Sequence, residues 1–284
     1  MPSIANIHFP SDHMEHLSRA ASVLTVDPLR SILFYAFPRL GAYFNGYQEL
    51  RGECCPGTDA EAVAATRRIL AEVEQLRRCA GIREITPYVA LNYEFACAGG
   101  AYSLTKPALL MPEQHLFRRT GRAFAGNGRW QESTWVFSDD QIRFCIAREL
   151  GQIKENSILL RIAIKVCLIA AVFAIYATPL GWGAGLPLLA GAIGLYIASE
   201  RLFQGRADQI GAEILGKRIG APRSAVAIAI ETLEKQQAQN LYRRGITPLG
   251  KWYITRSGNN TFDLLHPYLS TRIERLQTML EKLT

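Results

Sequence analysis

The stretch Ala147-Arg148-Glu149-Leu150-Gly151-Gln152 places a glutamate between two polar residues that are four positions apart. Residues four positions apart lie on one face of an α-helix, so Arg148 and Gln152 would project to the same side with Glu149 beside them. The sequence before the stretch predicts such a helix, because Ser138 can cap its first turn and begins a capping box. We expect the helix to continue towards residue 155.

The composition of the 284 residues is that of a protein with its own core, with 49% hydrophobic and 20% charged residues. The net charge of +7 is compatible with nucleic acid or an anionic membrane as a partner. The basic residues are dispersed, however, and no nucleic-acid-binding motif accompanies them. The sequence therefore predicts no binding to nucleic acid.

Cysteine usage and the N-terminal sequence both indicate a cytosolic location for the polar parts of the chain. The six cysteines form no C-x-x-C pair, which is typical of reduced thiols. Residues 1–30 include several charged residues and histidines but no apolar core of the signal-peptide type, so we expect no signal peptide. His8, His13 and His16 are interpreted as solvated side chains rather than a metal site.

Residues 158–198 form an apolar block in which only Arg161 and Lys165 are charged. The segment Pro179–Pro187 divides it into two arms of about 20 residues, the length that spans a bilayer. We expect a transmembrane helical hairpin, with Trp182 at the far interface and Arg161 and Lys165 at the near interface, on the cytoplasmic side. Two alternatives stay open: a buried hairpin in a soluble helical protein, and a hairpin that inserts only into a target membrane.

The remaining pattern predicts an α+β fold that is mainly helical. Periodic apolar residues predict helices at Thr58–Cys79, Arg223–Gln239 and Ser270–Leu283. A strand is expected within Ile85–Phe95, resuming at Ala101–Thr105 after two glycines. We expect an exposed loop at 121–130, which contains three glycines, and a less regular segment at 247–255.

Four further pieces of sequence, in chain order, accompany the quoted stretch: Phe95–Leu110, Ser138–Arg143, Gln204-Gly-Arg-Ala-Asp208 and Leu265-His-Pro followed by Arg272-Ile-Glu-Arg-Leu276. Together they resemble the HtpX-like and CAAX-prenyl-type membrane zinc metallopeptidases, a gluzincin group. The first piece resembles the strand along the substrate groove, and the third stands where the family has E-x-x-A-D after a transmembrane hairpin. The resemblance covers about residues 60–284.

The resemblance implies a gluzincin-like metallopeptidase domain with a small sheet, interrupted by the hairpin. The expected divisions are an N-terminal segment outside the resemblance (1–57), the first half of the domain (58–157), the transmembrane hairpin (158–199) and the second half of the domain (200–284). On this reading the groove strand contributes Phe95, Gly99, Gly100, Tyr102 and Thr105.

The residue types at the family's active-site positions differ from the zinc-binding pattern. Arg148 and Gln152 stand where the family has two zinc-binding histidines, and Gln204 stands where it has a glutamate ligand. Glu149 keeps the place of the general base. Asp208 and His266 stand where the family has residues that support the zinc ligands.

These replacements predict that zinc is absent and that no other cofactor takes its place. Arginine stays protonated and has no lone pair for a metal, and a glutamine carbonyl is a poor ligand beside imidazole or carboxylate. We expect Arg148 to supply the missing positive charge by pairing with Glu149 and Asp208, because a buried Glu149 without a partner would be costly to keep ionised.

The expected function is that of a membrane-embedded pseudopeptidase that binds polypeptides, regulates a relative or acts as a scaffold. An extended polypeptide would add to the sheet edge, and the lipid bilayer is the second expected partner. The alternative is an active membrane metalloendopeptidase with a relocated or atypical site. Catalysis by Cys145 is poorly supported, because no histidine partner is evident. The oligomeric state stays open.

Overall fold

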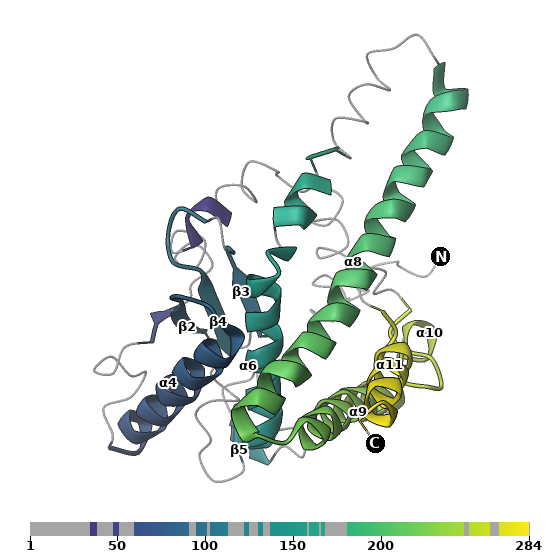
Figure 1. Cartoon of the computed structure of the whole chain (residues 1–284). Helices are drawn as coiled ribbons and strands as arrows, with labels where there is room; N and C mark the ends of the chain where they lie inside the picture. Colours follow the sequence, from purple (N-terminus) through teal and green to yellow (C-terminus); the bar gives the residue numbers. More distant parts are fainter. Residues whose placement is uncertain are drawn as a thin grey trace, which may run out of the picture.

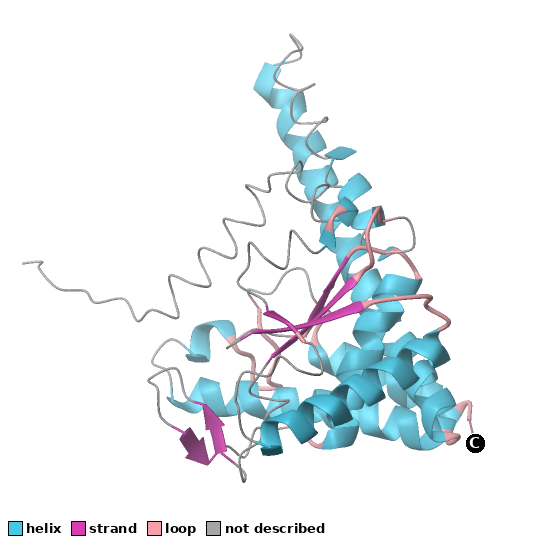
Figure 2. Ribbon diagram, turned by 90° about the vertical axis from the view of Figure 1, so that its left-hand side faces the viewer, coloured by secondary structure: helices cyan, strands magenta, loops and turns pink. Residues whose placement is uncertain are grey.

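The computed structural model of the chain describes residues 35–38, 48–50, 60–90, 95–100, 103–112, 122–124, 130–132, 137–157, 159–164, 166–167, 181–246, 250–261 and 267–283. Helices make up most of these residues, and a small sheet lies on one side of them (Figure 1, Figure 2). The expectation of a mainly helical α+β domain is therefore confirmed.

Helix α6 (Asp139–Lys154) runs through the centre of the domain and carries the stretch at 147–152. Its capping box forms as expected. The backbone N–H of Gln141 donates to the Ser138 Oγ at 3.2 Å, and the backbone N–H of Ser138 donates to the Gln141 Oε1 at 2.9 Å. Two aspartates in the first turn add negative charge at the positive end of the helix dipole. Most side chains of α6 are buried, so its polar residues at 148–152 lie inside the domain.

Four strands form a sheet in the order β1-β2-β4-β3. They are β1 (Gln48–Glu49), β2 (Thr86–Ala90), β3 (Ala96–Ala98) and β4 (Ala108–Pro112). β2 and β4 are parallel, whereas β1 and β3 run antiparallel to their neighbours. Among the described strands, β3 is thus an edge strand, and both β3 and β4 pack against α6.

Helix α4 (Ala60–Ala80) confirms the helix predicted at 58–79 and covers α6 from the side of the sheet (Figure 1). Val73, Leu76 and Ala80 recur at helical spacing and are almost fully buried. They join the main core, which also contains residues of α6, β2 and β4. The sheet and α4 therefore hold α6 in place from one side.

Residues 103–105 form a turn, so the predicted resumption of the strand at 101–105 is wrong for these residues. The Ser103 amide donates to the Gly100 carbonyl at 3.2 Å, and the Ser103 Oγ lies 2.7 Å from the Gly100 carbonyl oxygen and 3.0 Å from that of Thr105. Because these contacts close a turn, the chain returns to the sheet only at Ala108.

The loop predicted at 121–130 is also partly wrong, because it contains one short strand and the first residue of another. β5 (Arg122–Phe124) pairs with β6 (Trp130–Glu132) in antiparallel register. The glycines at 126 and 128, which suggested a loop, stand in the sequence between these two strands. The glycine content therefore marked the connection of a hairpin and not the whole segment.

Two long helices cover the other side of α6, α8 (Gly181–Ile219) and α9 (Pro222–Ile246), and α11 (Leu269–Glu281) packs on these two. α11 confirms the predicted C-terminal helix, and α9 extends beyond its predicted end at 239. A short helix, α10 (Gly250–Tyr253), lies in the segment that was expected to be less regular. Figure 1 shows that the N-terminal half of α8 projects beyond the domain, while its C-terminal half packs between α6 and α9.

The predicted transmembrane hairpin lies only partly within the described residues. Helical residues are present at 159–164 and 166–167, and α8 contains the second arm, but residues 168–180 lie outside the description. In the part of the chain that the structure describes, no helix has a stretch long and apolar enough to cross a membrane. The hairpin stays a prediction, and its expected boundary between residues 199 and 200 falls inside the continuous helix α8.

α6 and α8 approach each other closely at two glycines. A Cβ atom at Gly151 would lie 2.8 Å from the Cγ2 of Ile210, and one at Gly211 would lie 2.8 Å from the Cα of Arg148. Both separations are well below ordinary carbon–carbon contact. Glycine at these positions thus allows residues 148–152 of α6 to face residues 204–208 of α8.

The Gly211→Ala substitution is expected to lower the free energy of unfolding by about 1–3 kcal/mol, because the added methyl group meets the backbone of Arg148. Gly245→Ala on α9 is the matched control. A Cβ there meets nothing within 4 Å, and alanine favours a helix over glycine by roughly 0.5–1 kcal/mol. Denaturant unfolding compares the two variants. Equal stability of the two would contradict a close helix crossing.

Candidate functional site

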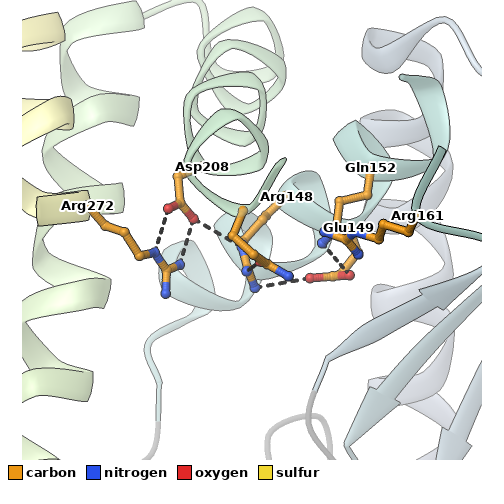
Figure 3. A network of polar contacts seen from close by, with 7 residues as sticks. Arg148, Glu149, Gln152, Arg161, Asp208 and Arg272 are labelled. Carbon is orange, nitrogen blue, oxygen red and sulfur yellow. Dashed lines mark hydrogen bonds and ion pairs between the residues drawn. The ribbon is translucent and has the colours of Figure 1, made fainter. Parts of the chain in front are cut away.

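Five predicted site residues meet where α6 and α8 cross, with Arg148 at the centre (Figure 3). The Arg148 Nη1 lies 3.2 Å from the Glu149 Oε1, and the Arg148 Nε lies 3.0 Å from the Asp208 Oδ1. The Arg148 Nη2 donates to the Gln204 Oε1. The pairing of Arg148 with Glu149 and Asp208 that the sequence led us to expect is therefore present.

Asp208 has a second guanidinium partner, Arg272 of α11. The Arg272 Nε and Nη2 donate to the two carboxylate oxygens of Asp208 at 2.6 and 2.7 Å, and both side chains are almost fully buried. We predicted no role for Arg272, although it belongs to the C-terminal motif. Its signal in the sequence is an arginine directly before Ile273, on the buried face of an amphipathic helix.

The network continues from Glu149 in the other direction. The Gln152 Nε2 donates to the Glu149 Oε2 at 3.0 Å, and the Gln152 Oε1 accepts from the Arg161 Nη1 at 2.9 Å. The Arg161 Nε in turn lies 3.0 Å from the Glu200 Oε2, and its guanidinium stands over the Phe203 ring at 5.7 Å. Arg161 was expected at a membrane interface, but its side chain is only 16% exposed and points into the domain (Figure 3).

Positive and negative groups alternate along this buried network, which comprises Arg272, Asp208, Arg148, Glu149, Arg161 and Glu200 with Gln152 and Gln204 between them. Three guanidinium groups balance three carboxylates, so the network is neutral as it stands. Glu149 is 3% exposed, and burial raises the pKa of its carboxyl while the charge of Arg148 acts in the opposite direction. The arginines therefore offset a desolvation cost that would otherwise fall on the carboxylates.

The groups at this site do not fit a zinc ion. Arg148 has only N–H donors, and the carbonyl oxygens of Gln152 and Gln204 already accept hydrogen bonds from guanidinium groups. Zinc in proteins is held by imidazole, thiolate and carboxylate groups, and the carboxylates of Glu149 and Asp208 are both paired with arginine here. The described part of the chain contains no group of three or more such residues that could hold a metal ion.

Two thiols lie close to the network. Burial raises the pKa of the Cys145 thiol to about 12. Burial and the negative charge of Glu149 also raise the pKa of the Cys97 thiol. A thiol needs its thiolate form to act as a nucleophile, so neither cysteine is activated for catalysis. The position of Cys97 was not predicted; it lies on the edge strand β3, which packs against α6.

The predicted groove residues divide between the edge strand and the turn that follows it. Phe95 directly precedes β3, Gly99 and Gly100 directly follow it, and Thr105 lies in the turn at 103–105. Gly99 has a φ of +82°, which a residue with a side chain rarely adopts. Two predicted site residues lie outside the described residues, Tyr102 and His266.

Part of the N-terminal segment packs on this end of β3. The Leu104 amide donates to the Ala36 carbonyl at 3.0 Å, and the Tyr35 hydroxyl donates to the Asn156 Oδ1 at 2.5 Å. A Cβ atom at Gly99 would meet the Pro38 side chain at 2.5 Å. Residues 35–38, which lie outside the family resemblance, thus belong to the same domain as the site.

The comparison with family models agrees with this arrangement. The model of peptidase family M48 matches residues 107–280, which is more than half of the chain and includes α6, α8 and all but one residue of α11. A search of the curated proteins and a search of the solved structures give no match. The matched range contains every residue of the buried network, and the chain belongs to peptidase family M48.

Proposed function

We propose that this protein is a membrane-embedded pseudopeptidase that binds polypeptides and does not cleave them. The observation that carries the proposal is the position of Arg148, whose guanidinium contacts Glu149, Gln204 and Asp208. These residues stand where the resemblance places the zinc ligands, the general base and the residue that supports a ligand. A cation brought to the ligand position at residue 148 would meet a guanidinium, which carries a positive charge and has no lone pair to give.

Arg148 also explains how the domain holds together without a metal. Its guanidinium links a carboxylate on α6 to a carboxylate and an amide on α8. Arginine stays charged at all physiological pH values and presents several donors in one fixed plane, which suits contacts to more than one acceptor. The crossing of α6 and α8 is thus joined by the side chain that replaces a histidine of the family pattern.

The edge strand β3 supports the binding of an extended polypeptide. β3 ends the order of the described sheet, its residues are only partly buried, and it packs against α6, the helix that carries Glu149. An extended chain can add to such an edge through main-chain hydrogen bonds. This surface would serve a client polypeptide or a partner protein, including an active relative that this protein regulates or scaffolds.

Photo-crosslinking tests the binding site. A benzoylphenylalanine at position 98 on β3 is expected to crosslink to fluorescent casein, whereas the same residue at exposed position 234 on α9 is expected to give at most a tenth of the signal. Mass spectrometry of the unlinked casein should find it intact after incubation. Equal crosslinking from both positions would contradict binding at β3.

One variant distinguishes our proposal from the alternative function, an active membrane metalloendopeptidase with an atypical site. Casein or prenyl-peptide cleavage that is lost in Glu149→Gln would establish the peptidase and overturn our proposal. Under our proposal neither the wild type nor this variant cleaves the substrates, and both bind casein. Glu149 could serve the alternative only as a base that activates a water molecule for attack on the substrate. In the family that water is bound to zinc, and the contacts of Glu149 here are Arg148 and Gln152 in place of a metal.

The membrane part of the proposal rests on the apolar block at 158–198 and on the projecting half of α8 (Figure 1). We propose that this hairpin inserts into the bilayer with the peptidase-like domain on the cytoplasmic side. Carbonate extraction of membranes that contain the full chain is expected to leave it in the pellet. Release into the supernatant would contradict permanent insertion and favour a hairpin that inserts only into a target membrane.

A further inference from the structure

The C-terminal part of α9 and the segment that follows it are basic as far as Asp263. Between Glu234 and Asp263 the sequence has five lysines and arginines and no acidic residue. The buried network and the edge strand make no use of these residues. A run of this kind gives one surface a strong positive potential and favours an anionic partner.

Large apolar and aromatic side chains are exposed in the same segment. Trp252 of α10 is 81% exposed, Ile246 of α9 is 60% exposed and Tyr242 is 53% exposed. Tyr242 and Ile246 are four residues apart, so they share one face of α9, with Arg243 beside them. We name these residues, together with Lys251, the α9–α10 patch; its members are Tyr242, Arg243, Ile246, Lys251 and Trp252.

The exposed tryptophan is carried by a segment that is fixed to α9. The Arg244 Nε donates to the Ile254 carbonyl at 2.9 Å, the Asn240 Nδ2 donates to the Gly258 carbonyl at 2.9 Å, and the Gln237 Nε2 donates to the Ser257 carbonyl at 2.6 Å. Three side chains of one helix thus hold the backbone that follows α10. Trp252 is therefore presented outward by an ordered support and not by a loose loop.

The α9–α10 patch lies at the end of the domain from which α8 projects. In Figure 1, α10 stands at the side of the α9–α11 pair that faces the projecting half of α8. The contacts agree with this view: Asn259 hydrogen-bonds to Ser270 at the start of α11, and the Arg201 guanidinium of α8 stands 5.7 Å from the centre of the Tyr268 ring. Arg201 comes directly after the apolar block of α8.

We infer that the α9–α10 patch docks on the anionic headgroup surface of a lipid bilayer. Tryptophan and tyrosine prefer the boundary between headgroups and hydrocarbon, and each basic residue beside an anionic leaflet strengthens binding roughly five-fold. If the hairpin is inserted, the end of the domain from which α8 projects faces the bilayer, and the patch lies at that end. The inference rests on the membrane part of the proposed function and not on the metal-free groove.

Tryptophan quenching by brominated lipid tests the inference. The full chain is incorporated into nanodiscs of phosphatidylcholine alone or with one quarter phosphatidylglycerol, with bromine near the glycerol end of the acyl chains. In the anionic discs, Trp252→Phe is expected to remove at least a fifth of the quenched emission. Trp130→Phe on β6, the matched control, is expected to remove none. Neutralising the patch with Arg243→Gln and Lys251→Gln should abolish the contribution of Trp252.

The outcomes separate docking of the patch from insertion of the hairpin. Trp182→Phe reports the hairpin, because Trp182 is predicted at its far interface. Quenching that depends on Trp252 only in anionic discs supports the inference whatever Trp182→Phe shows. Equal quenching in the wild type and Trp252→Phe overturns the inference and favours an acidic protein as the partner of the patch. Quenching of Trp252 to the same extent in both lipid compositions also overturns it, because charge would then play no part.

Discussion

Arg148→Ala is expected to lower the free energy of unfolding by about 3–5 kcal/mol, the cost of breaking a buried ion pair and leaving its partner uncompensated. The Glu149 carboxylate, 3% exposed, would lose the guanidinium at 3.2 Å. Asp208 would keep Arg272, so the loss should fall mainly on Glu149. Denaturant unfolding of the full chain in detergent measures the effect.

Two further variants make this prediction specific to charge. Arg78→Ala on α4 removes an exposed arginine from an ion pair with Glu74 and is expected to cost less than about 1 kcal/mol. Adding Glu149→Gln to Arg148→Ala should recover part of the loss, because no buried carboxylate is then left beside the missing guanidinium. A loss below about 1 kcal/mol for Arg148→Ala would mean that the buried network does not hold α6 and α8 together.

Restoring the three ligand positions together, with Arg148→His, Gln152→His and Gln204→Glu, is expected to create a zinc-dependent protein. The metal-free variant should be less stable than the wild type, because Glu149, Asp208 and the new glutamate lie together without Arg148. Zinc at about 100 times its dissociation constant would then add roughly 2.7 kcal/mol. Thermal unfolding with and without zinc measures the difference.

The single substitution Arg148→His is the control for this experiment. It supplies one imidazole at the site without the other two ligands, and three protein ligands are the usual minimum for a zinc site of this kind. Zinc should therefore leave its unfolding midpoint unchanged. If zinc stabilises the triple variant no more than the single one, the positions of residues 148, 152 and 204 do not form the family's metal site.

The sequence was sufficient for the centre of the site because local signals placed it. The capping box at Ser138 set the start of α6, and the spacing of Arg148 and Gln152 put both on one face. The resemblance then supplied Gln204 and Asp208 from a second helix. The contact of Arg148 with these residues followed from charge, since Glu149 and Asp208 need a cation once zinc ligands are missing.

The outer parts of the network could not be predicted, because they depend on contacts between distant residues. Arg272 lies 64 residues from Asp208, and its place on the buried face of an amphipathic helix does not identify its partner. Arg161 was placed at a membrane interface because it lies near the start of an apolar block, yet tertiary packing turns it towards Glu200. The turn at 103–105 was missed because side-chain contacts of Ser103 compete with strand formation.

Metal analysis of the purified full chain tests the absence of zinc most directly. The protein is isolated without chelator, equilibrated with a micromolar excess of zinc and freed of unbound metal, and its zinc content is measured against protein concentration. We predict well under a tenth of an equivalent of zinc, the same as for Glu149→Gln, and about one equivalent for the triple variant with restored ligands. One equivalent of zinc on the wild-type chain would contradict a guanidinium in the place of the metal.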